Sequence, residues 1–513
     1  MTTIDCREVQ IMIYSLRLTS LMIPLLCGVM LAAPAVAHDG DDHPPAKVPD
    51  ATAHRPTAIP DRIILTWSGD TARTQAVNWR TDATVKKAFA QIAPASAAPK
   101  FIAKAVSVDA KTQPFETDLG VAHYHSAVFT DLAPSSLYAY RVGDGVNWSE
   151  WFHFRTGSDK PEPFSFIYFG DAQNDIKSLW SRVIRGAYSD APQAKFILHA
   201  GDLVNHGSSD GEWGEWHAAG GWVNGMVPSV PTPGNHEYAR PNALTDAQAK
   251  AWAEARLKLE AEAKAAGKPF NAQAAFEKFG PKAQLTAHWR TQFTLPENGP
   301  EGLKESAYYL DYQGTRIVSL NSNERRQEQV AWLDEALGKN PNRWTIVTFH
   351  HPVYSAAKNR DNKEVRDLWQ PVFDKYKVDL VLQGHDHTYA RSGLRVYDNV
   401  ATGASVRDGE SGTVYVVSVS GPKMYDLTKE DWMKRAAEDT QLYQTIKIDG
   451  DRLTYQAKTA TGELYDAFDL VKHEGRPNEL VDKTPKTPEY RRAAPRESQK
   501  AATEIKAPVQ AGR

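Results

Sequence analysis

Five clusters of polar residues follow short apolar runs, and their residue types suit metal-assisted chemistry. The clusters are Gly170-Asp171-Ala172-Gln173, Gly201-Asp202 with Asn205 and His206, Gly234-Asn235-His236-Glu237, His350-His351-Pro352 and Gly384-His385-Asp386-His387. Sites in α/β sheets form at the carboxyl ends of strands, so clusters at five strand ends can converge on one place. A single Gly-Asp pair is usually a turn and a single histidine usually packs. All five in this order predict one site.

The donors in these clusters fit a pair of metal ions. Aspartate and asparagine supply oxygen, and histidine supplies imidazole nitrogen. A carboxylate between two cations can bridge them at about 4 Å, the separation used for in-line attack at phosphorus. A metal-bound hydroxide is a nucleophile at neutral pH, and two cations neutralise charge that develops on phosphoryl oxygens. The pattern therefore favours hydrolysis of phosphate esters.

The segments between the clusters alternate between short apolar runs and helical patterns, which indicates α/β layering. The apolar runs are 164–169, 195–199, 226–230, 316–320, 345–349 and 378–382. Alternating runs in 414–470 predict strands that complete a second sheet. An Ala/Lys/Glu-rich stretch at about 243–290 predicts an inserted pair of helices. The polar tail, 473–513, is predicted to be disordered.

Residues 58–157 have the pattern of an all-β domain. Ile63, Leu65 and Trp67 recur at every second position, as along one face of a strand. A turn containing Pro134 leads into a strand with Tyr138 near its start, which resembles the tyrosine corner of a β-sandwich. We therefore expect a fibronectin-III-like sandwich, which a linker at 38–57 precedes.

The N-terminal residues, 1–37, are predicted to be a signal peptide. Arg17 precedes an apolar run that ends in Ala35-Val36-Ala37, an A-x-A cleavage pattern, and the alternative is a transmembrane anchor. Cleavage would place the protein outside the cytoplasm, secreted or periplasmic, with no further membrane segment. Both cysteines lie in this segment, so the mature chain would form no disulfide and offer no thiolate ligand. The formal net charge of −3 argues against a nucleic-acid-binding surface.

The five clusters resemble those of the calcineurin-like metallophosphoesterases, and the sandwich before them resembles the N-terminal domain of plant-type purple acid phosphatases. The resemblance covers most of the chain from about 58 to 470. It implies an α/β four-layer sandwich, with two sheets flanked by helices, in a metallophosphoesterase domain at 162–472. It also implies a dinuclear, acid-phosphatase-like hydrolase for small-molecule phosphate esters.

The resemblance implies a role for each residue of the metal centre. The first metal would be bound by Asp171 and His387, the bridge would be Asp202, and the second metal would be bound by Asn235, His350 and His385. His236 would lie beside the substrate phosphate and stabilise transition-state charge or protonate the leaving oxygen. The other catalytic candidates are His206, which replaces a phosphate-binding arginine, and His351, which either acts as an acid or is turned away.

Two positions depart from the family pattern. Asn205 replaces the tyrosine that gives purple acid phosphatases their ferric colour, and Gln173 replaces a histidine ligand of other members. The first metal would then rely on Asp171, Asp202 and His387, with an amide oxygen of Gln173 or Asn205. Among two divalent or mixed-valence ions (Mn, Fe, Zn or Mg), oxygen-rich donors favour Mn²⁺ or Mg²⁺.

Other functions remain as alternatives at this point. A nucleotidase or a phosphodiesterase would use the same residues, and a non-catalytic adhesive or binding protein would use the sandwich alone. Three tryptophans after the second cluster, Trp213, Trp216 and Trp222, either line a substrate pocket or pack in the core. No separate organic cofactor site, no nucleic-acid partner and no particular oligomeric state is predicted.

Overall fold

The structure is a computed structural model that describes residues 47–240, 246–267, 270, 280, 282–397, 412–428 and 430–492. The expected signal peptide, residues 38–46 of the linker and residues 493–513 lie outside these described residues. The described chain from Pro49 onward belongs to one compact unit. Among the helices described, none has the length and apolar character that a membrane crossing requires.

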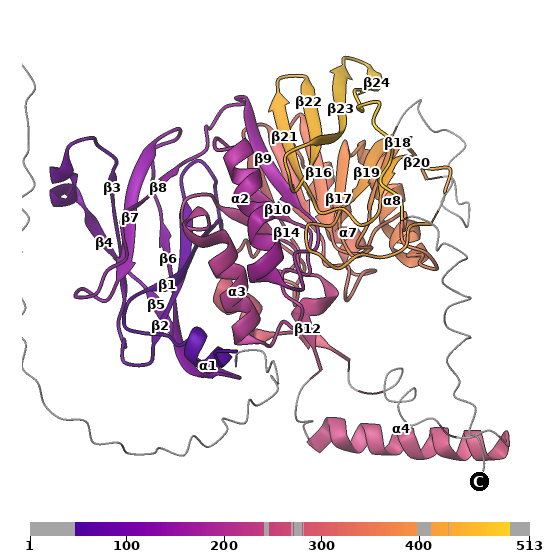
Figure 1. The fold of residues 1–513 in the computed structure, drawn as a ribbon, viewed down its shortest axis with the longest axis horizontal. Helices are drawn as coiled ribbons and strands as arrows, with labels where there is room; N and C mark the ends of the chain where they lie inside the picture. Colours follow the sequence, from indigo (N-terminus) through magenta and orange to yellow (C-terminus); the bar gives the residue numbers. More distant parts are fainter. Residues whose placement is uncertain are drawn as a thin grey trace, which may run out of the picture. The chain divides into compact units, whose positions relative to one another are not determined.

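The N-terminal domain is a sandwich of two four-stranded antiparallel sheets, as the sequence predicts (Figure 1). One sheet has the order β1 (Asp61–Thr66), β2 (Gln75–Asp82), β6 (Gly120–Phe129), β5 (Lys111–Thr117). The other has the order β4 (Val106–Asp109), β3 (Phe89–Pro94), β7 (Leu137–Gly143), β8 (Phe152–Arg155). Trp79, Phe129 and Tyr140 are buried between them. The hydroxyl of Tyr138 accepts a hydrogen bond from the Ala133 N–H at 2.9 Å, which ties β7 to the preceding turn.

The larger domain contains two seven-stranded mixed sheets (Figure 1). The first sheet has the order β11 (Ser229–Pro231), β10 (Ile197–His199), β9 (Phe164–Phe169), β21 (Leu442–Asp449), β22 (Arg452–Thr459), β23 (Leu464–His473), β24 (Arg476–Asp482). The second has the order β14 (Tyr308–Tyr312), β15 (Thr315–Ser319), β16 (Trp344–Phe349), β17 (Leu380–Gln383), β19 (Thr413–Val417), β18 (Tyr389–Arg395), β20 (Met433–Ala437). The strands that precede the site are parallel in each sheet: β9, β10 and β11 in the first, and β16 and β17 in the second.

Side-chain alternation along the strands produces the layers. Ile346 and Leu382 of the second sheet share a core with Ile446 of the first, so the two sheets pack against each other. Their neighbours, such as Val347, point the other way and pack with Trp369 of a helix. Helices α7 (Gln329–Gly338) and α8 (Lys363–Tyr376) cover this outer face. With α2 (Ser181–Asp190) and α3 (Asp210–Gly220) beside the first sheet, the predicted four-layer α/β sandwich is confirmed.

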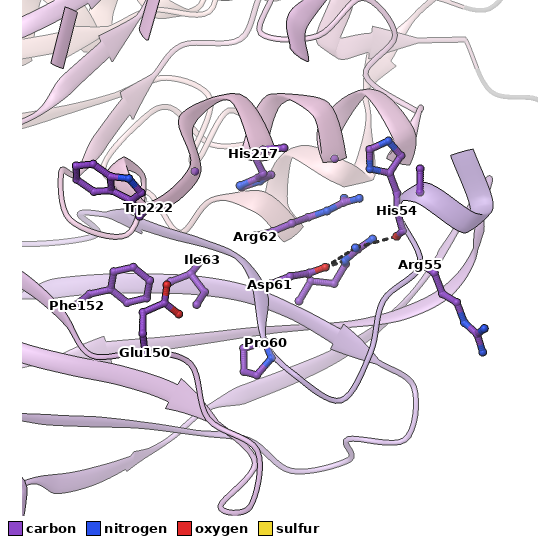
Figure 2. Close-up of a pocket in the computed structure, with 15 residues that line it drawn as sticks. His54, Arg55, Pro60, Asp61, Arg62, Ile63, Glu150, Phe152, His217 and Trp222 are labelled. Carbon is purple, nitrogen blue, oxygen red and sulfur yellow. Dashed lines mark hydrogen bonds and ion pairs between the residues drawn. The ribbon is translucent and has the colours of Figure 1, made fainter. Parts of the chain in front are cut away.

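A buried charge cluster joins the sandwich to α3. The Asp210 carboxylate accepts hydrogen bonds from Arg62 at 2.7 Å, from Arg80 at 2.9 Å and from the Tyr124 hydroxyl at 3.0 Å. Arg80 also pairs with Asp61 at 2.6 Å. Figure 2 shows this junction, where a cavity of about 330 Å³ lies between the first strand of the sandwich and α3. Both guanidinium groups are buried and paired. The cluster therefore fixes Asp210, the first residue of α3, at the end of the loop that follows β10.

The folded part of the chain continues past residue 473, where the sequence predicts a disordered tail. The expectation of disorder from 473 is wrong for 473–492, because β24 pairs with β23 and the chain then continues along the domain. Glu489 accepts a hydrogen bond from the Ala436 N–H at 2.7 Å, and the Thr487 carbonyl accepts one from Arg435 at 2.8 Å. An edge strand exposes one face to water, so its polar composition resembles that of a disordered segment.

The insertion contains one long described helix, α4 (Asp246–Ala265), and the short α6 (Ala287–Gln292). At its base β12 (Tyr238–Ala239) pairs with β13 (Gln284–Leu285). Most of the second expected helix falls on 268–281, which lies largely outside the described residues. The linker before the sandwich includes a four-residue helix, α1 (Asp50–Ala53).

Candidate metal centre

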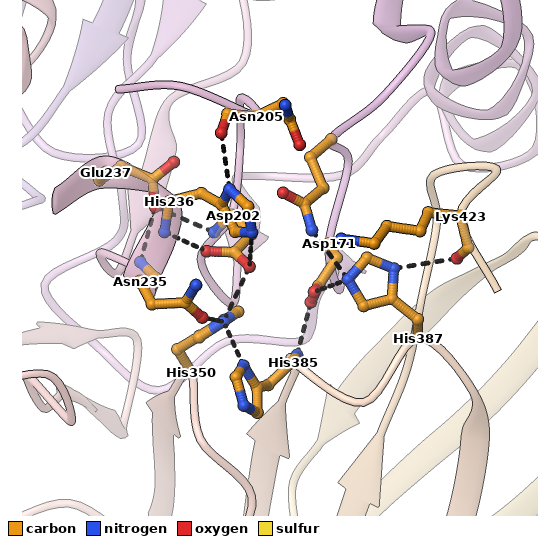
Figure 3. A network of polar contacts seen from close by, with 12 residues as sticks. Asp171, Asp202, Asn205, Asn235, His236, Glu237, His350, His385, His387 and Lys423 are labelled. Carbon is orange, nitrogen blue, oxygen red and sulfur yellow. Dashed lines mark hydrogen bonds and ion pairs between the residues drawn. The ribbon is translucent and has the colours of Figure 1, made fainter. Parts of the chain in front are cut away.

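The structure brings all five predicted clusters to one place (Figure 3). Each follows a strand of the larger domain: β9 leads to Asp171, β10 to Asp202, β11 to Asn235, β16 to His350, and β17 to His385 and His387. The loops approach so closely that a Cβ on Gly234 would lie 2.1 Å from Oδ1 of Asp202. Only glycine fits there, which explains the repeated glycines of the motifs.

Three of the gathered residues have a left-handed backbone. The φ angles are 51° at Asp202, 76° at His385 and 47° at His387. Non-glycine residues in this region carry a cost of about 1–2 kcal/mol each. Such strain persists where the surrounding structure imposes it, and it is common at functional sites. Here it turns one carboxylate and two imidazoles toward a common point.

Four acceptor groups face one another on one side of the site, and we call Asp202, Asn235, His350 and His385 the second-metal group. Nε2 of His350 lies 3.0 Å from Oδ1 of Asn235, 3.0 Å from Oδ2 of Asp202 and 3.1 Å from Nδ1 of His385. Nδ1 of His350 donates to the Ala200 carbonyl at 2.9 Å, so Nε2 of the neutral ring presents a lone pair. Two oxygens and two nitrogens that converge in this way could hold a metal ion.

The first-metal group consists of Asp171, Asp202 and His387. Nε2 of His387 lies 3.1 Å from Oδ2 of Asp171, and Nδ1 donates to the Lys423 carbonyl at 2.9 Å. This bond leaves the lone pair of Nε2 directed at the carboxylate. Among the described residues, the buried Oδ2 of Asp171 has no hydrogen-bond donor. Both features fit a metal ion between the two side chains.

The charges of the site also call for a cation. Burial raises the pKa of Asp171 to about 7, and the Asp202 carboxylate contributes to this. Burial opposes protonation of His350, yet the carboxylates of Asp202 and Asp171 raise its pKa to about 9. Burial lowers the pKa of His387 to about 3, and the Lys423 ammonium acts in the same direction. The buried carboxylates therefore carry negative charge that a proton or a metal ion must balance.

Glu237 stabilises the loops after β10 and β11 and does not face the metal groups. Its buried carboxylate accepts hydrogen bonds from the N–H groups of Asp202 at 3.0 Å, Leu203 at 2.8 Å and Gly234 at 2.6 Å. Burial and the Asp202 charge raise the pKa of Glu237 to about 8. The sequence motif includes this residue, but nothing in its spacing indicates that it connects two ligand loops.

His236 lies beside the bridging position. Its main-chain N–H donates to Oδ1 of Asp202 at 2.8 Å. Its Nδ1 lies 2.6 Å from the Asn205 carbonyl, and its Nε2 lies 3.9 Å from Oδ2 of Asp202. The ring is thus held by one nitrogen while the other faces the site, an arrangement that suits proton or hydrogen-bond donation.

The other two catalytic candidates lie differently. Nδ1 of His206 is 2.6 Å from Oε1 of Glu212, and its side chain is 68% exposed, so it lies at the rim. The ring of His351 is buried against His385, with 4.2 Å between centroids, and its Nδ1 bonds the Ser322 hydroxyl at 2.8 Å. This packing favours a positioning role for His351.

The structure distinguishes Gln173 from Asn205, the two amides that the sequence offers as ligands of the first metal. The amide nitrogen of Gln173 lies 2.8 Å from Nε2 of His387, and its buried oxygen has no partner among the described residues. Asn205 instead bonds Asn174 at 3.1 Å and His206 at 3.1 Å. Rotation of the Gln173 amide by about 180° would direct its oxygen at the first-metal group. Trp213 and Trp216 are buried core residues, whereas Trp222 is 54% exposed.

A sixth strand end contributes to the site and is absent from the predicted set. After β19 the chain runs through Ser420, Gly421 and Pro422 to Lys423. The N–H groups of Ser420 and Gly421 donate to the Asp171 carbonyl at 3.0 and 2.6 Å. A Gly-Pro-Lys sequence after a buried strand is a signal of a strand-end loop, but lysine does not match the metal-donor pattern.

Comparison with known proteins agrees with this architecture. Residues 60–156 match the purple acid phosphatase N-terminal domain, and residues 164–389 match the calcineurin-like phosphoesterases. The larger domain thus has the fold and the clustered donors of a calcineurin-like phosphoesterase domain. The sandwich before it is similar to the N-terminal domain of purple acid phosphatases.

The individual relatives are distant. The chain is 23% identical to "Probable inactive purple acid phosphatase 1" of Arabidopsis thaliana, over 68% of this chain and 58% of that protein. It is 23% identical to "Fe(3+)-Zn(2+) purple acid phosphatase 12" of the same plant, over 53% of this chain and 52% of that protein. The chain thus spans between half and three-fifths of the length of these relatives. The structure of purple acid phosphatase PPD1 from yellow lupin seeds has a TM-score of 0.63 at 18% identity, covers 81% of this chain and 75% of that one, and shows the same fold.

Proposed function

We propose that the protein hydrolyses phosphate esters of small molecules at a centre of two metal ions. The convergence of Asn235, His350 and His385 on the Asp202 carboxylate carries this proposal, because the oxygens and nitrogens that face one another here are the donors that metal ions take in proteins. Asp202 also belongs to the second group of donors, with Asp171 and His387. One carboxylate shared by two groups is the arrangement that a bridged pair of cations requires.

The residues of the chain divide the work of the reaction. When bound, two divalent cations would activate a water molecule and neutralise charge on the phosphoryl oxygens. Asp202 belongs to both groups of donors and so fixes their distance from each other. Glu237 fixes the loops that carry Asp202 and Asn235. His236 faces the site through Nε2 and donates a proton or a hydrogen bond to the oxygen that leaves phosphorus.

The donors favour particular metals. The relative named Fe(3+)-Zn(2+) purple acid phosphatase 12 indicates a mixed pair for that protein. In this chain, the position of the ferric tyrosine ligand is Asn205, whose side chain is bound to Asn174 and His206. We propose that Gln173 supplies an amide oxygen to the first metal and that this harder donor set holds Mn²⁺ or Mg²⁺.

We also propose that the protein is exported. The apolar run that ends in Ala35-Val36-Ala37 resembles a cleaved signal peptide and supports a secreted or periplasmic location. Both cysteines precede this site, so the remaining chain suits an oxidising compartment without needing a disulfide. Mass determination of the N-terminus of the exported protein tests this proposal: a start at or near His38 supports it, and an intact leader contradicts it.

The activity is tested with p-nitrophenyl phosphate and bis(p-nitrophenyl) phosphate, each with and without Mn²⁺. Hydrolysis of either ester that a chelator abolishes and Mn²⁺ restores supports the proposed function. The ratio of the two rates distinguishes a monoesterase from a diesterase. A metal-loaded protein that hydrolyses neither ester would favour the binding-protein alternative.

A further inference from the structure

Lys423 lies beside the first-metal group and carries a positive charge. It is not among the site residues that the sequence predicts. It follows Pro422 in the loop after β19, and its main-chain carbonyl accepts the Nδ1 hydrogen of His387. In Figure 3 its side chain extends from this loop toward Asp171. The residue as a whole is half-buried.

The loop that carries Lys423 is held firmly against the first-metal loop. Ser420 and Gly421 donate to the Asp171 carbonyl, and the Trp180 indole donates to the Ser420 hydroxyl at 2.9 Å. A Cβ on Gly421 would lie 2.6 Å from the Gln173 carbonyl oxygen, so no larger residue permits this approach. The position of Lys423 relative to the first metal is therefore set by backbone contacts.

Among the described residues, no aspartate or glutamate forms an ion pair with the Lys423 ammonium. Its Nζ lies 5.5 Å from the ring centroid of Tyr425. The same ring packs on His387, with 4.6 Å between centroids. By contrast, the nearby Arg360 donates to the His385 carbonyl at 3.0 Å and lies 3.5 Å from Asp386. Arg360 is thus occupied by the protein, whereas Lys423 is available to a ligand.

We propose that Lys423 binds an anionic oxygen of the phosphoryl group, both in the substrate and in the phosphate product. This inference rests on the proposed function and adds a specific ligand contact to it. An ammonium donates strong hydrogen bonds to phosphate oxygen, and the bond from His387 to the Lys423 carbonyl places this residue on the first-metal side. His236 lies at the opposite, Asn205 side of Asp202, so the two groups would contact different oxygens of one phosphoryl group (Figure 3).

The test is binding of inorganic phosphate to the Mn²⁺-loaded full chain, measured by calorimetry, with metal content determined on the same samples. We expect Lys423→Gln to weaken phosphate binding about 10- to 100-fold, the loss typical of one hydrogen bond to a charged group. Both metals should stay bound. Lys423→Arg should recover most of the affinity, because it restores the charge.

A matched control is Lys447→Gln, which removes an exposed lysine of β21 that pairs with Asp449 at 3.1 Å. It should leave phosphate binding unchanged. If Lys423→Gln binds phosphate as tightly as the wild type, the inference is wrong while the proposed function stands. Loss of metal from Lys423→Gln would also overturn it, since the ammonium would then act on the metal group and not on phosphate. A wild type that holds two metals but neither binds phosphate nor hydrolyses esters would reject both proposals.

Discussion

Nδ1 of His236 lies 2.6 Å from the main-chain oxygen of Asn205. A carbonyl oxygen only accepts, so this contact fixes the proton on Nδ1 of the neutral ring and leaves Nε2 to face Asp202 at 3.9 Å. One imidazole nitrogen is therefore committed to the loop, and the other is directed at the place where a phosphate ester would react. Protonated on both nitrogens, the ring can deliver a proton there without losing its anchor.

We predict that His236→Ala keeps both metals but loses turnover, by about 10²–10⁴ for substrates with poor leaving groups. Alkyl phosphates need a proton on the departing oxygen, whereas p-nitrophenolate leaves well without one. The loss should therefore be larger for alkyl than for aryl esters. Measuring kcat across a leaving-group series, with metal content on each sample, decides the matter. A uniform loss accompanied by metal depletion would show that His236 only holds the loop.

Gln173 and Asn205 provide a matched pair of amides beside the first-metal group. We expect Gln173→Ala to lower the affinity for one of the two metals and Asn205→Ala to leave both affinities within a few-fold of the wild type. The reason is that only Gln173 reaches His387, at 2.8 Å, while Asn205 bonds Asn174 and His206. Calorimetric titration of the metal-free variants with Mn²⁺ measures both affinities. Equal effects of the two substitutions would exclude Gln173 as the distinguishing ligand.

The metal-loaded protein should not be purple. Asn205 replaces the tyrosine of the purple enzymes and offers no phenolate for charge transfer to ferric iron. The check is a visible absorption spectrum of protein reconstituted with iron. A strong band in the middle of the visible range would mean that another tyrosine ligates the metal, and Tyr425, which packs on His387, would be the first to replace.

Glu237→Ala should destabilise the protein even though the residue binds no metal in this account. Removal of the carboxylate leaves the buried N–H groups of Asp202, Leu203 and Gly234 without acceptors. At about 1–3 kcal/mol for each unsatisfied group, the free energy of unfolding should fall by about 3 kcal/mol or more. Glu335→Ala, which removes an exposed partner of Lys339 on α7, should change it by less than about 0.5 kcal/mol. Denaturant unfolding of metal-free samples measures both, and a loss for Glu237→Ala no larger than that of the control would contradict this role.

Much of the centre can be predicted from sequence because its ligands follow apolar runs, in most cases after a glycine. Asp171, Asp202, Asn235, His350 and His385 each continue a strand, and parallel strands bring their carboxyl ends to one edge. Lys423 could not be found in this way, since its relation to His387 is a main-chain contact between loops 36 residues apart. The role of Glu237 is likewise set by three N–H groups that converge only in the folded loops.

In the fold, too, local sequence patterns predict some elements, whereas others depend on contacts in the folded chain. Alternation predicts the sandwich, because one buried face imposes a period of two. Continuous apolar runs predict the parallel strands of the larger domain, because these strands are buried on both faces. Strand β24 escapes prediction because its residues Arg476–Asp482 lie at a sheet edge, and their burial is intermediate or low. The tail beyond it is held by hydrogen bonds such as that between Glu489 and Ala436, which no local pattern encodes.

Asp202→Ala should abolish activity and reduce binding of both metals, since its carboxylate belongs to both donor groups. His385→Ala provides the matched comparison, because that side chain belongs to the second-metal group alone. It should weaken one metal more than the other. Equilibrium dialysis against Mn²⁺ separates the two patterns, and an Asp202→Ala protein with two metals and near-normal turnover would show that Asp202 is not the bridge.

The most direct test of the account is a titration of the metal-free full chain with Mn²⁺ while hydrolysis of p-nitrophenyl phosphate is followed. Because Asp202 joins two groups of donors, we predict that activity rises with metal binding and reaches its plateau at two ions per chain. A plateau at one ion per chain would contradict a dinuclear centre. Two bound ions without hydrolysis of this ester or of its bis-ester would contradict the proposed phosphoesterase function.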